Sequence, residues 1–196
     1  MSNSFEILMN QLGMPAEMRQ APALAQADIE RVVVHKISKV WEFHFVFSNI
    51  LPIEIFLELK KGLREEFSKT GNKAIFEIKV LSQEFSNQLL QSYYREAFSE
   101  GPCASQGFRS LYQNLQVRAE GNQLFIEGSE AIDKEHFKKN HLPNLAKQLE
   151  KFGFPTFNCQ VEKNDVLTQE QEEAFHAENE QIVQAANEEA LRAMEQ

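Results

Sequence analysis

The stretch Val40–Phe47, with the sequence VWEFHFVF, decides the fold of the first half of the chain. Its aromatic residues occupy every second position, and Glu42, His44 and Val46 lie between them. Successive side chains of a β-strand point to opposite faces of the sheet, so the aromatic rings share one face. That face is either a platform on which nucleic-acid bases stack or the inner wall of a hydrophobic core.

The neighbouring sequence favours the core. An amphipathic helix is predicted directly after the strand, over 52–69, and its apolar stripe needs an apolar partner. Single-strand binders carry basic residues beside exposed aromatic groups, whereas here the neighbours Glu42 and His44 point to the opposite face. Burying each Phe is worth roughly 1.5–3 kcal/mol, which four exposed rings would forfeit. We therefore interpret the aromatic face as core, with base stacking as the alternative.

Further strands complete a first module around this stretch. The β-branched run 29–37 and a tight turn at Ser38-Lys39 predict a hairpin over 29–48. Thr70-Gly71-Asn72 ends the predicted helix, and KAIFEIKV, at 73–80, predicts a third strand. The order is strand, strand, helix, strand.

The same order recurs over 115–161, although residue identity between the two stretches is low. Pro143 should kink or split the helix of this second module near Asn140, because proline removes a backbone donor. The expected elements are strands at 115–119 and 123–128, a helix over 130–152 capped by Ser129, and a strand at 156–161.

The predicted fold class is α+β, with two small strand-strand-helix-strand modules of an altered KH-like type, joined by helices. The usual KH loop, G-x-x-G with a basic residue between two helices, is absent. The divisions are an N-terminal helix and linker (1–28, with the helix over 3–13), the first module (29–81), a helical connector (82–114), the second module (115–165) and an acidic helix (166–196).

Charge is unevenly placed along the chain. From Thr168 to Gln196 there are eight Glu and one Arg, whereas the preceding 167 residues hold 21 acidic and 19 basic groups. A near-neutral body with an acidic tail gives little electrostatic support for DNA binding, which needs clustered Lys and Arg. The helical pattern continues to Gln196 without a cap, so we expect the chain to be cut from a longer one, before a catalytic region.

Signatures of catalysis and of cofactor or metal binding are missing from the sequence. It has no GxSxG, P-loop or HExxH motif, and Cys103 and Cys159 form neither a CxxC pair nor a Cys/His cluster. His136 and His141 are five residues apart, and the lysines around them are typical of a solvated helix face. We expect no catalytic, cofactor or metal site, no signal peptide and no membrane span, and a cytoplasmic location.

Two stretches resemble a known family. VWEFHF, before a helix that begins with proline, and EHFKKNHLPNLAKQLEKFGF at 135–154, before a last strand and an acidic helix, are similar to the N-terminal region of PolC-type DNA polymerase III α subunits. The resemblance is of streptococcal type and runs from about residue 5 to the end. Its specificity comes from the order and length of the elements, because neither stretch is a chemical signature.

The resemblance implies a docking role in chromosomal DNA replication. The expected partners are the clamp-loader τ subunit and the rest of the polymerase chain, and the modules would look like the C-terminal domain of τ. The parent would be a DNA-directed DNA polymerase with 3′–5′ exonuclease, whose catalytic carboxylates have no counterpart here. DNA would be bound through the parent enzyme, weakly or not at all by this segment.

The candidate partner-binding surface is placed on the first module, on polar faces that remain once the aromatic face is buried. It uses the outer strand face, with Glu42 and His44, or the outer helix face, with Lys60, Lys61 and Arg64. The competing function is a single-stranded nucleic-acid-binding module of the same polymerase, based on the aromatic strand and Lys138-Lys139. A third reading is a spacer that binds nothing.

Overall fold

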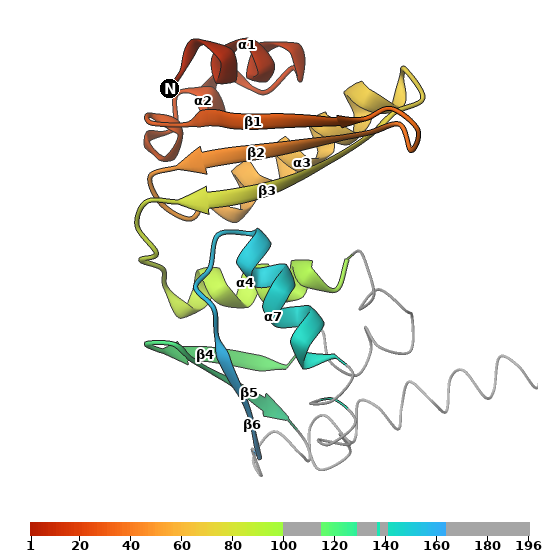
Figure 1. Ribbon diagram of the computed structural model, residues 1–196. Coiled ribbons are helices and arrows are strands. Elements are labelled where there is room, and N and C mark those ends of the chain that lie inside the picture. The colour runs from red at the N-terminus through yellow and green to blue at the C-terminus, as the bar shows by residue number, and fades with distance from the viewer. Residues whose placement is uncertain (100–114, 129–136, 138–140, 164–196) are drawn as a thin grey trace, which may run out of the picture.

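The computed structural model describes residues 1–99, 115–128, 137 and 141–163 (Figure 1). In these residues the protein is α+β, with two three-stranded sheets and helices packed around them, as predicted. The likeness to KH domains stays a prediction. None of the described helices is long and apolar enough to cross a bilayer.

The first module is a three-stranded sheet with one crossover helix. β1 (Asp28–His35) pairs antiparallel with β2 (Val40–Phe47), and β3 (Lys73–Val80) pairs parallel with β2 on its other side. The crossover between the parallel strands is α3 (Ile53–Ser68), which lies behind the sheet in Figure 1. The predicted hairpin and helix are therefore confirmed, and Lys39 turns the hairpin with a φ of 55°.

The aromatic face of β2 is core, which confirms the interpretation of VWEFHFVF. Phe45 and Phe47 are 0% exposed and Phe43 is 4% exposed. Phe5, from α1 (Asn3–Gln11), meets Phe45 and Phe47 edge-to-face, with ring centroids 5.6 and 5.5 Å apart. Three rings at consecutive inward positions therefore give α1 and α3 one continuous surface to pack on.

The segment 14–27 is packed rather than a free linker. It holds α2 (Ala16–Arg19) and a 3₁₀ turn, η1 (Pro22–Leu24), and it buries Met14, Leu24 and Ala27. The Ser2 amide donates to the Ala27 carbonyl at 2.8 Å, which fastens the end of the segment to the start of the chain. Its few apolar groups are not periodic, so the sequence pattern did not show that they are buried.

The second module repeats the topology of the first. β4 (Gln116–Glu120) pairs antiparallel with β5 (Gln123–Gly128), and β6 (Asn158–Lys163) pairs parallel with β5. The described helix, α7 (Leu142–Lys151), carries Pro143 in its first turn, close to the predicted break at Asn140. The predicted Ser129 cap, most of 130–140, the loop 100–107 and the acidic helix lie outside the described residues.

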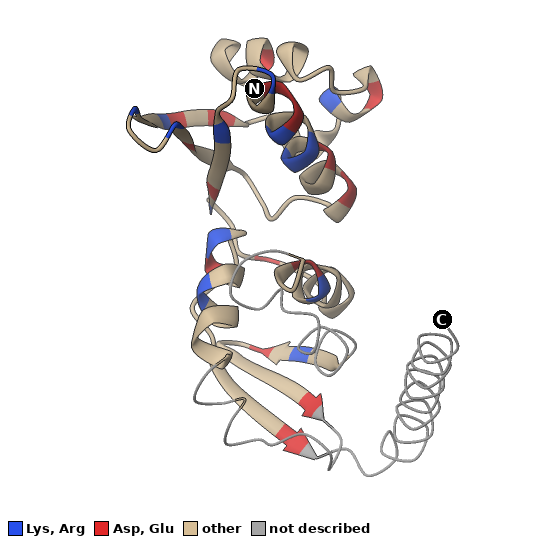
Figure 2. Cartoon of the chain, turned by 90° about the vertical axis from the view of Figure 1, so that its right-hand side faces the viewer, with Lys and Arg blue, Asp and Glu red and all other residues tan. Residues whose placement is uncertain are grey.

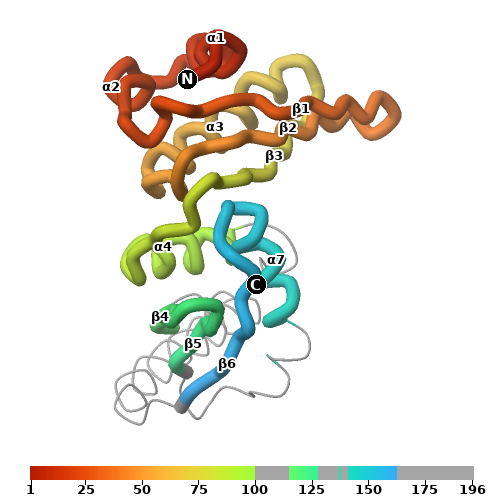
Figure 3. Tube along the Cα trace, turned by 60° about the vertical axis from the view of Figure 1, so that its left-hand side comes forward, coloured from red at the N-terminus to blue at the C-terminus, as the bar shows by residue number. Residues whose placement is uncertain are grey.

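Aromatic side chains join the two modules. α4 (Asn87–Ala97) and α7 lie between the two sheets (Figures 1 and 3). The Phe56 ring of α3 contacts Tyr93 of α4 and Phe152 after α7, with centroids 4.9 and 4.8 Å apart. The buried Tyr93 hydroxyl donates to the Leu51 carbonyl at 3.0 Å. The modules therefore share a buried junction.

Candidate partner-binding site

Two of the predicted site residues form a polar cluster on the open face of the first sheet. Glu42 Oε1 lies 3.0 Å from His44 Nε2, and Glu42 Oε2 lies 3.1 Å from His35 Nε2 on β1. His44 Nδ1 is 3.8 Å from Glu77 Oε2 on β3, its direct neighbour in the sheet. Arg31 Nη2 reaches His44 Nε2 at 3.1 Å. The cluster thus links all three strands.

The chemistry of this cluster favours ion pairing over metal binding. The hydrogen bond from His35 holds the pKa of the Glu42 carboxyl below its ordinary value, and burial opposes this only in part. Glu42, His44 and Glu77 offer ligand atoms within 4.8 Å of one another, a donor set that a divalent cation accepts. The Arg31 guanidinium, however, occupies the same imidazole nitrogen as Glu42, and its charge disfavours a second cation there.

The three predicted cations of α3 have different surroundings. Lys60 Nζ lies 2.5 Å from Glu96 Oε1 and 3.2 Å from Ser99 Oγ, so it ties α3 to α4. Lys61 is exposed, and its ammonium lies 3.4 Å from Glu58 Oε1. Lys60 and Arg64, four residues apart, both line a cleft at the edge of β3, whereas Lys61 is not part of its lining.

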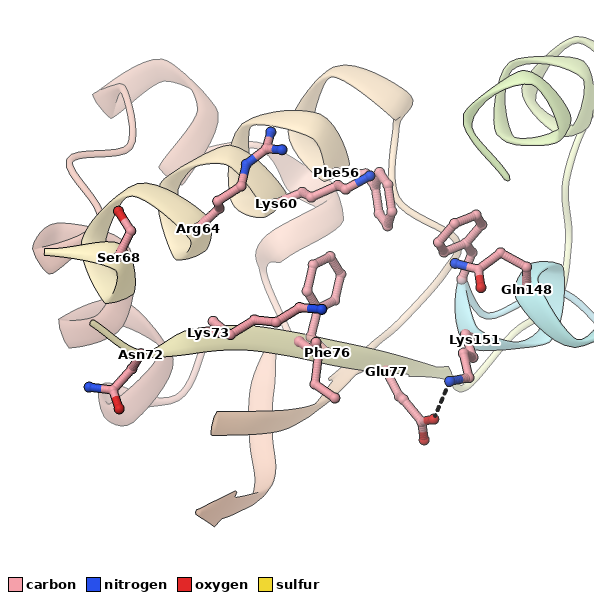
Figure 4. A pocket seen from close by; sticks show the side chains of 13 residues that line it. Phe56, Lys60, Arg64, Ser68, Asn72, Lys73, Phe76, Glu77, Gln148 and Lys151 are labelled. Carbon is pink, nitrogen blue, oxygen red and sulfur yellow. Dashed lines mark ion pairs between the residues drawn. The ribbon is translucent and has the colours of Figure 1, made fainter. Parts of the chain in front are cut away.

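This cleft has a volume of about 720 Å³ and lies between α3, β3 and α7 (Figure 4). Figure 4 shows Lys60 and Arg64 extending from α3 on one side, and Lys73 on β3 on the other. Lys151 closes one end, where its Nζ lies 3.5 Å from Glu77 Oε1. The lining residues are Phe56, Lys60, Arg64, Ser68, Asn72, Lys73, Ala74, Ile75, Phe76, Glu77, Gln148, Lys151 and Phe152.

One wall of the cleft is the backbone of an edge strand, because β3 is the last strand of its sheet. The Lys73 amide donates to the carbonyl of Lys39, directly before β2, at 2.8 Å, and the Leu81 amide donates to the carbonyl of Phe47 in β2 at 3.0 Å. Backbone groups of a strand alternate in direction, so those of Ala74 and Phe76 point away from β2. Within the described residues, these two amides have no hydrogen-bond acceptor.

The far half of the β3 edge is covered by the second module. A β-carbon on Gly153 would lie 2.9 Å from Val80 Cγ1 and 3.2 Å from Ile78 Cγ2, so this backbone approaches the strand closely. The open part of the edge is therefore limited to the residues that line the cleft, 72–77.

The sequence did not point to Lys73, to Lys151 or to the edge of β3 as parts of a site. Lys151 comes from the other module, and only the packing of α7 beside β3 brings it to the cleft. The alternative surface at Lys138-Lys139 lies outside the described residues, and the aromatic strand is unavailable to bases because its face is buried. Acidic and basic residues are otherwise mixed over both modules (Figure 2).

The fold and the cleft define a class: a two-module α+β protein with a strand edge exposed in a basic cleft. Two family models match the chain: "DNA polymerase III polC-type N-terminus I" over residues 4–78 and "DNA polymerase III polC-type N-terminus II" over 92–196. The chain therefore belongs to the N-terminal region of the PolC-type DNA polymerase III family, in agreement with the resemblance seen in its sequence.

Relatives named "DNA polymerase III PolC-type" match over essentially the whole chain. Identity is 97% with the protein of Streptococcus pneumoniae (strain D39), 64% with that of Streptococcus sanguinis and 46% with that of Streptococcus suis. In each case all of this chain is covered, and it spans 13% of the length of the relative. No solved structure matches the chain.

Proposed function

We propose that this chain is the non-catalytic docking region of a replicative DNA polymerase, and that it binds the clamp-loader τ subunit during chromosomal replication. The polymerase and 3′–5′ exonuclease activities would belong to other parts of the parent protein. Membership of the PolC-type family supports the place in replication, since the matching relatives are named as DNA polymerase III.

The observation that carries the proposal is the cleft at the edge of β3. It contains Lys60 and Arg64, two of the cations expected to meet a partner, and it offers backbone amides that have no acceptor among the described residues and that a polypeptide can use. Of its three aromatic groups, Phe56 and Phe152 are 0% and 6% exposed, too buried for bases to stack on them, and Phe76 is half-buried. These features suit a protein partner better than a nucleic acid.

The test is a calorimetric titration of the 196-residue chain with the C-terminal region of τ from the same organism. Single-stranded DNA is titrated in parallel at two salt concentrations. We expect saturable τ binding and little affinity for DNA. Salt-sensitive DNA binding without τ binding would reject the docking role and favour the nucleic-acid-binding module.

A charge reversal then locates the surface. Arg64→Glu reverses a charge in the lining of the cleft. Lys61→Glu is the matched control, because it reverses a charge on the same helix but outside the lining. Lys60 is left intact because it holds α3 to α4. If only Arg64→Glu weakens τ binding, then the partner lies in the cleft. If both variants weaken τ binding equally, then the partner contacts the outer face of α3.

A further inference from the structure

We infer that the cleft at the edge of β3 takes an extended acidic segment of a partner protein, which adds to the first sheet as a fourth strand. This deepens the proposed function and rests on it for the identity of the partner, because it states the chemistry of the segment that the partner must present. The backbone, the charges and the floor of the cleft each support it.

The backbone supplies a template for strand addition. Ala74 and Phe76 direct their amides and carbonyls into the cleft, and an edge strand with free groups of this kind pairs readily with another chain. The open part, 72–77, has a length of about 20 Å at the usual rise of a strand. It therefore accommodates a segment of about six residues.

The two ends of the open edge limit where a strand can be added. Beyond Glu77 the loop after α7 closes on Ile78 and Val80, where Gly153 leaves no space for another chain. At the other end, Asn72 belongs to the turn that follows α3, and its side chain is hydrogen-bonded to Thr70. The added segment is therefore short and has a defined position along β3.

The charges select an acidic segment. Lys60, Arg64, Lys73 and Lys151 line the cleft against one lining carboxylate, Glu77, although the whole chain has a net charge of −9. Lys60 and Lys151 also pair with Glu96 and Glu77, which offsets part of the positive charge of the lining. Carboxylates placed along the cleft meet cations from both walls, whereas a basic segment is repelled.

The floor of the cleft is apolar. The half-buried Phe76 and the buried Phe56 and Phe152 lie below the charged groups, on the side where α3 covers the sheet. Side chains of an added strand alternate between the two faces of the sheet, so every second one faces this floor. A segment that combines acidic and apolar residues therefore fits better than a purely acidic run.

The test uses the 15N-labelled chain and an eight-residue peptide of alternating Glu and Val. We expect saturable binding, with the largest amide shifts at Ala74 and Phe76 and with slowed hydrogen exchange at both. Two kinds of control peptide should bind at least about tenfold more weakly. One has Lys in place of Glu, and the other is the Glu/Val peptide with every second backbone amide N-methylated, prepared in both possible registers. Oligothymidylate is titrated in the same way.

Variants connect the binding to the cleft. Arg64→Glu is expected to weaken the Glu/Val peptide about tenfold, and Lys61→Glu is expected to leave its affinity unchanged. Undiminished binding of the N-methylated peptides would overturn strand addition. The absence of saturable peptide binding, or tighter binding of oligothymidylate at the same amides, would overturn the acidic peptide as the ligand.

The τ titration separates this inference from the proposed function. If the peptide binds at Ala74 and Phe76 but τ does not bind, the inference stands and the τ-docking role fails. If τ binds while these two amides and the Arg64→Glu variant show no effect, the docking role stands and strand addition at β3 is wrong.

Discussion

The two modules have the same topology but different chemistry on the open faces of their sheets. In the first module the strands are joined by His44, Glu42 and Glu77, and in the second by Arg118, Glu127 and Glu162. Arg118 Nη2 lies 2.9 Å from Glu162 Oε2, and its guanidinium lies 4.1 Å from the centre of the Phe125 ring. The first cluster therefore joins imidazoles to carboxylates, whereas the second joins a guanidinium to carboxylates.

This difference teaches that the repeat preserves topology and not surface chemistry. Among the described residues the first module has the longer strands, of eight residues against five or six, and it carries the open edge of β3. The second contributes Lys151 and Gly153, which close one end of the cleft on the first. The second module therefore completes a cleft on its neighbour, and variants that affect one module or the junction can separate the two contributions.

The largest expected effect is on the core of the first module. Phe45→Ala removes a ring that is 0% exposed and that packs against Phe5 and Phe43, so the free energy of unfolding should fall by about 3–5 kcal/mol. Ile126→Val in the second core removes one methylene and should cost about 0.5–1.5 kcal/mol. Urea denaturation measures both, and a loss near 1 kcal/mol for Phe45→Ala would mean that the aromatic face is loosely packed.

A smaller effect is expected at the junction from Gly153→Ala. Gly153 has a φ of 98°, which costs a residue with a side chain about 1–3 kcal/mol, and the added carbon would lie 2.9 Å from Val80 Cγ1. Gly121 is the matched control, because its φ is 58° but nothing lies within 4 Å of the added carbon. Denaturation of both variants isolates the contact between modules, and equal losses would show that β3 and the loop after α7 adjust easily.

The sequence predicted those parts of the structure that depend on local periodicity. The alternation in VWEFHFVF predicted that its Phe rings lie in the core, and the apolar stripe of α3 predicted the helix that packs on them. Pro143 marked the start of α7. Of the predicted site residues, Lys60 and Arg64 line the cleft, whereas Lys61, Glu42 and His44 do not. The pairing of Lys60 with Glu96, 36 residues away, and the approach of Lys151 to β3 come from tertiary packing, which no local pattern contains.

The buried hydroxyl of Tyr93 allows a finer test of the junction. Tyr93→Phe keeps the ring between Phe56 and Phe154 but leaves the Leu51 carbonyl without its donor, which should cost about 1–3 kcal/mol. Burial, with smaller contributions from Glu54 and Glu96, raises the pKa of this phenol, so it remains a donor at any ordinary alkaline pH. Denaturation measures the loss, and an unchanged stability would mean that water replaces the donor.

The smallest expected effect concerns the cluster of Glu42, His35 and His44 on the first sheet. The pKa of Glu42 is lowered from 4.5 in the folded protein, first by the hydrogen bond from His35. Folding thus favours the charged form of Glu42. Its contribution to stability is complete above pH 4.5 and is lost as the pH falls through the lower pKa of Glu42 in the folded protein. Glu42→Gln should remove this pH dependence, with a cost at neutral pH of at most about 1 kcal/mol for a partly exposed pair.

A double-mutant cycle with His35→Gln identifies the cause of this pH dependence. If His35 supplies the main interaction, then the double variant should be about as stable as either single variant at each pH, because both substitutions break the same hydrogen bond. Additive losses would instead assign the effect to His44, which lies 3.0 Å from the other oxygen of Glu42.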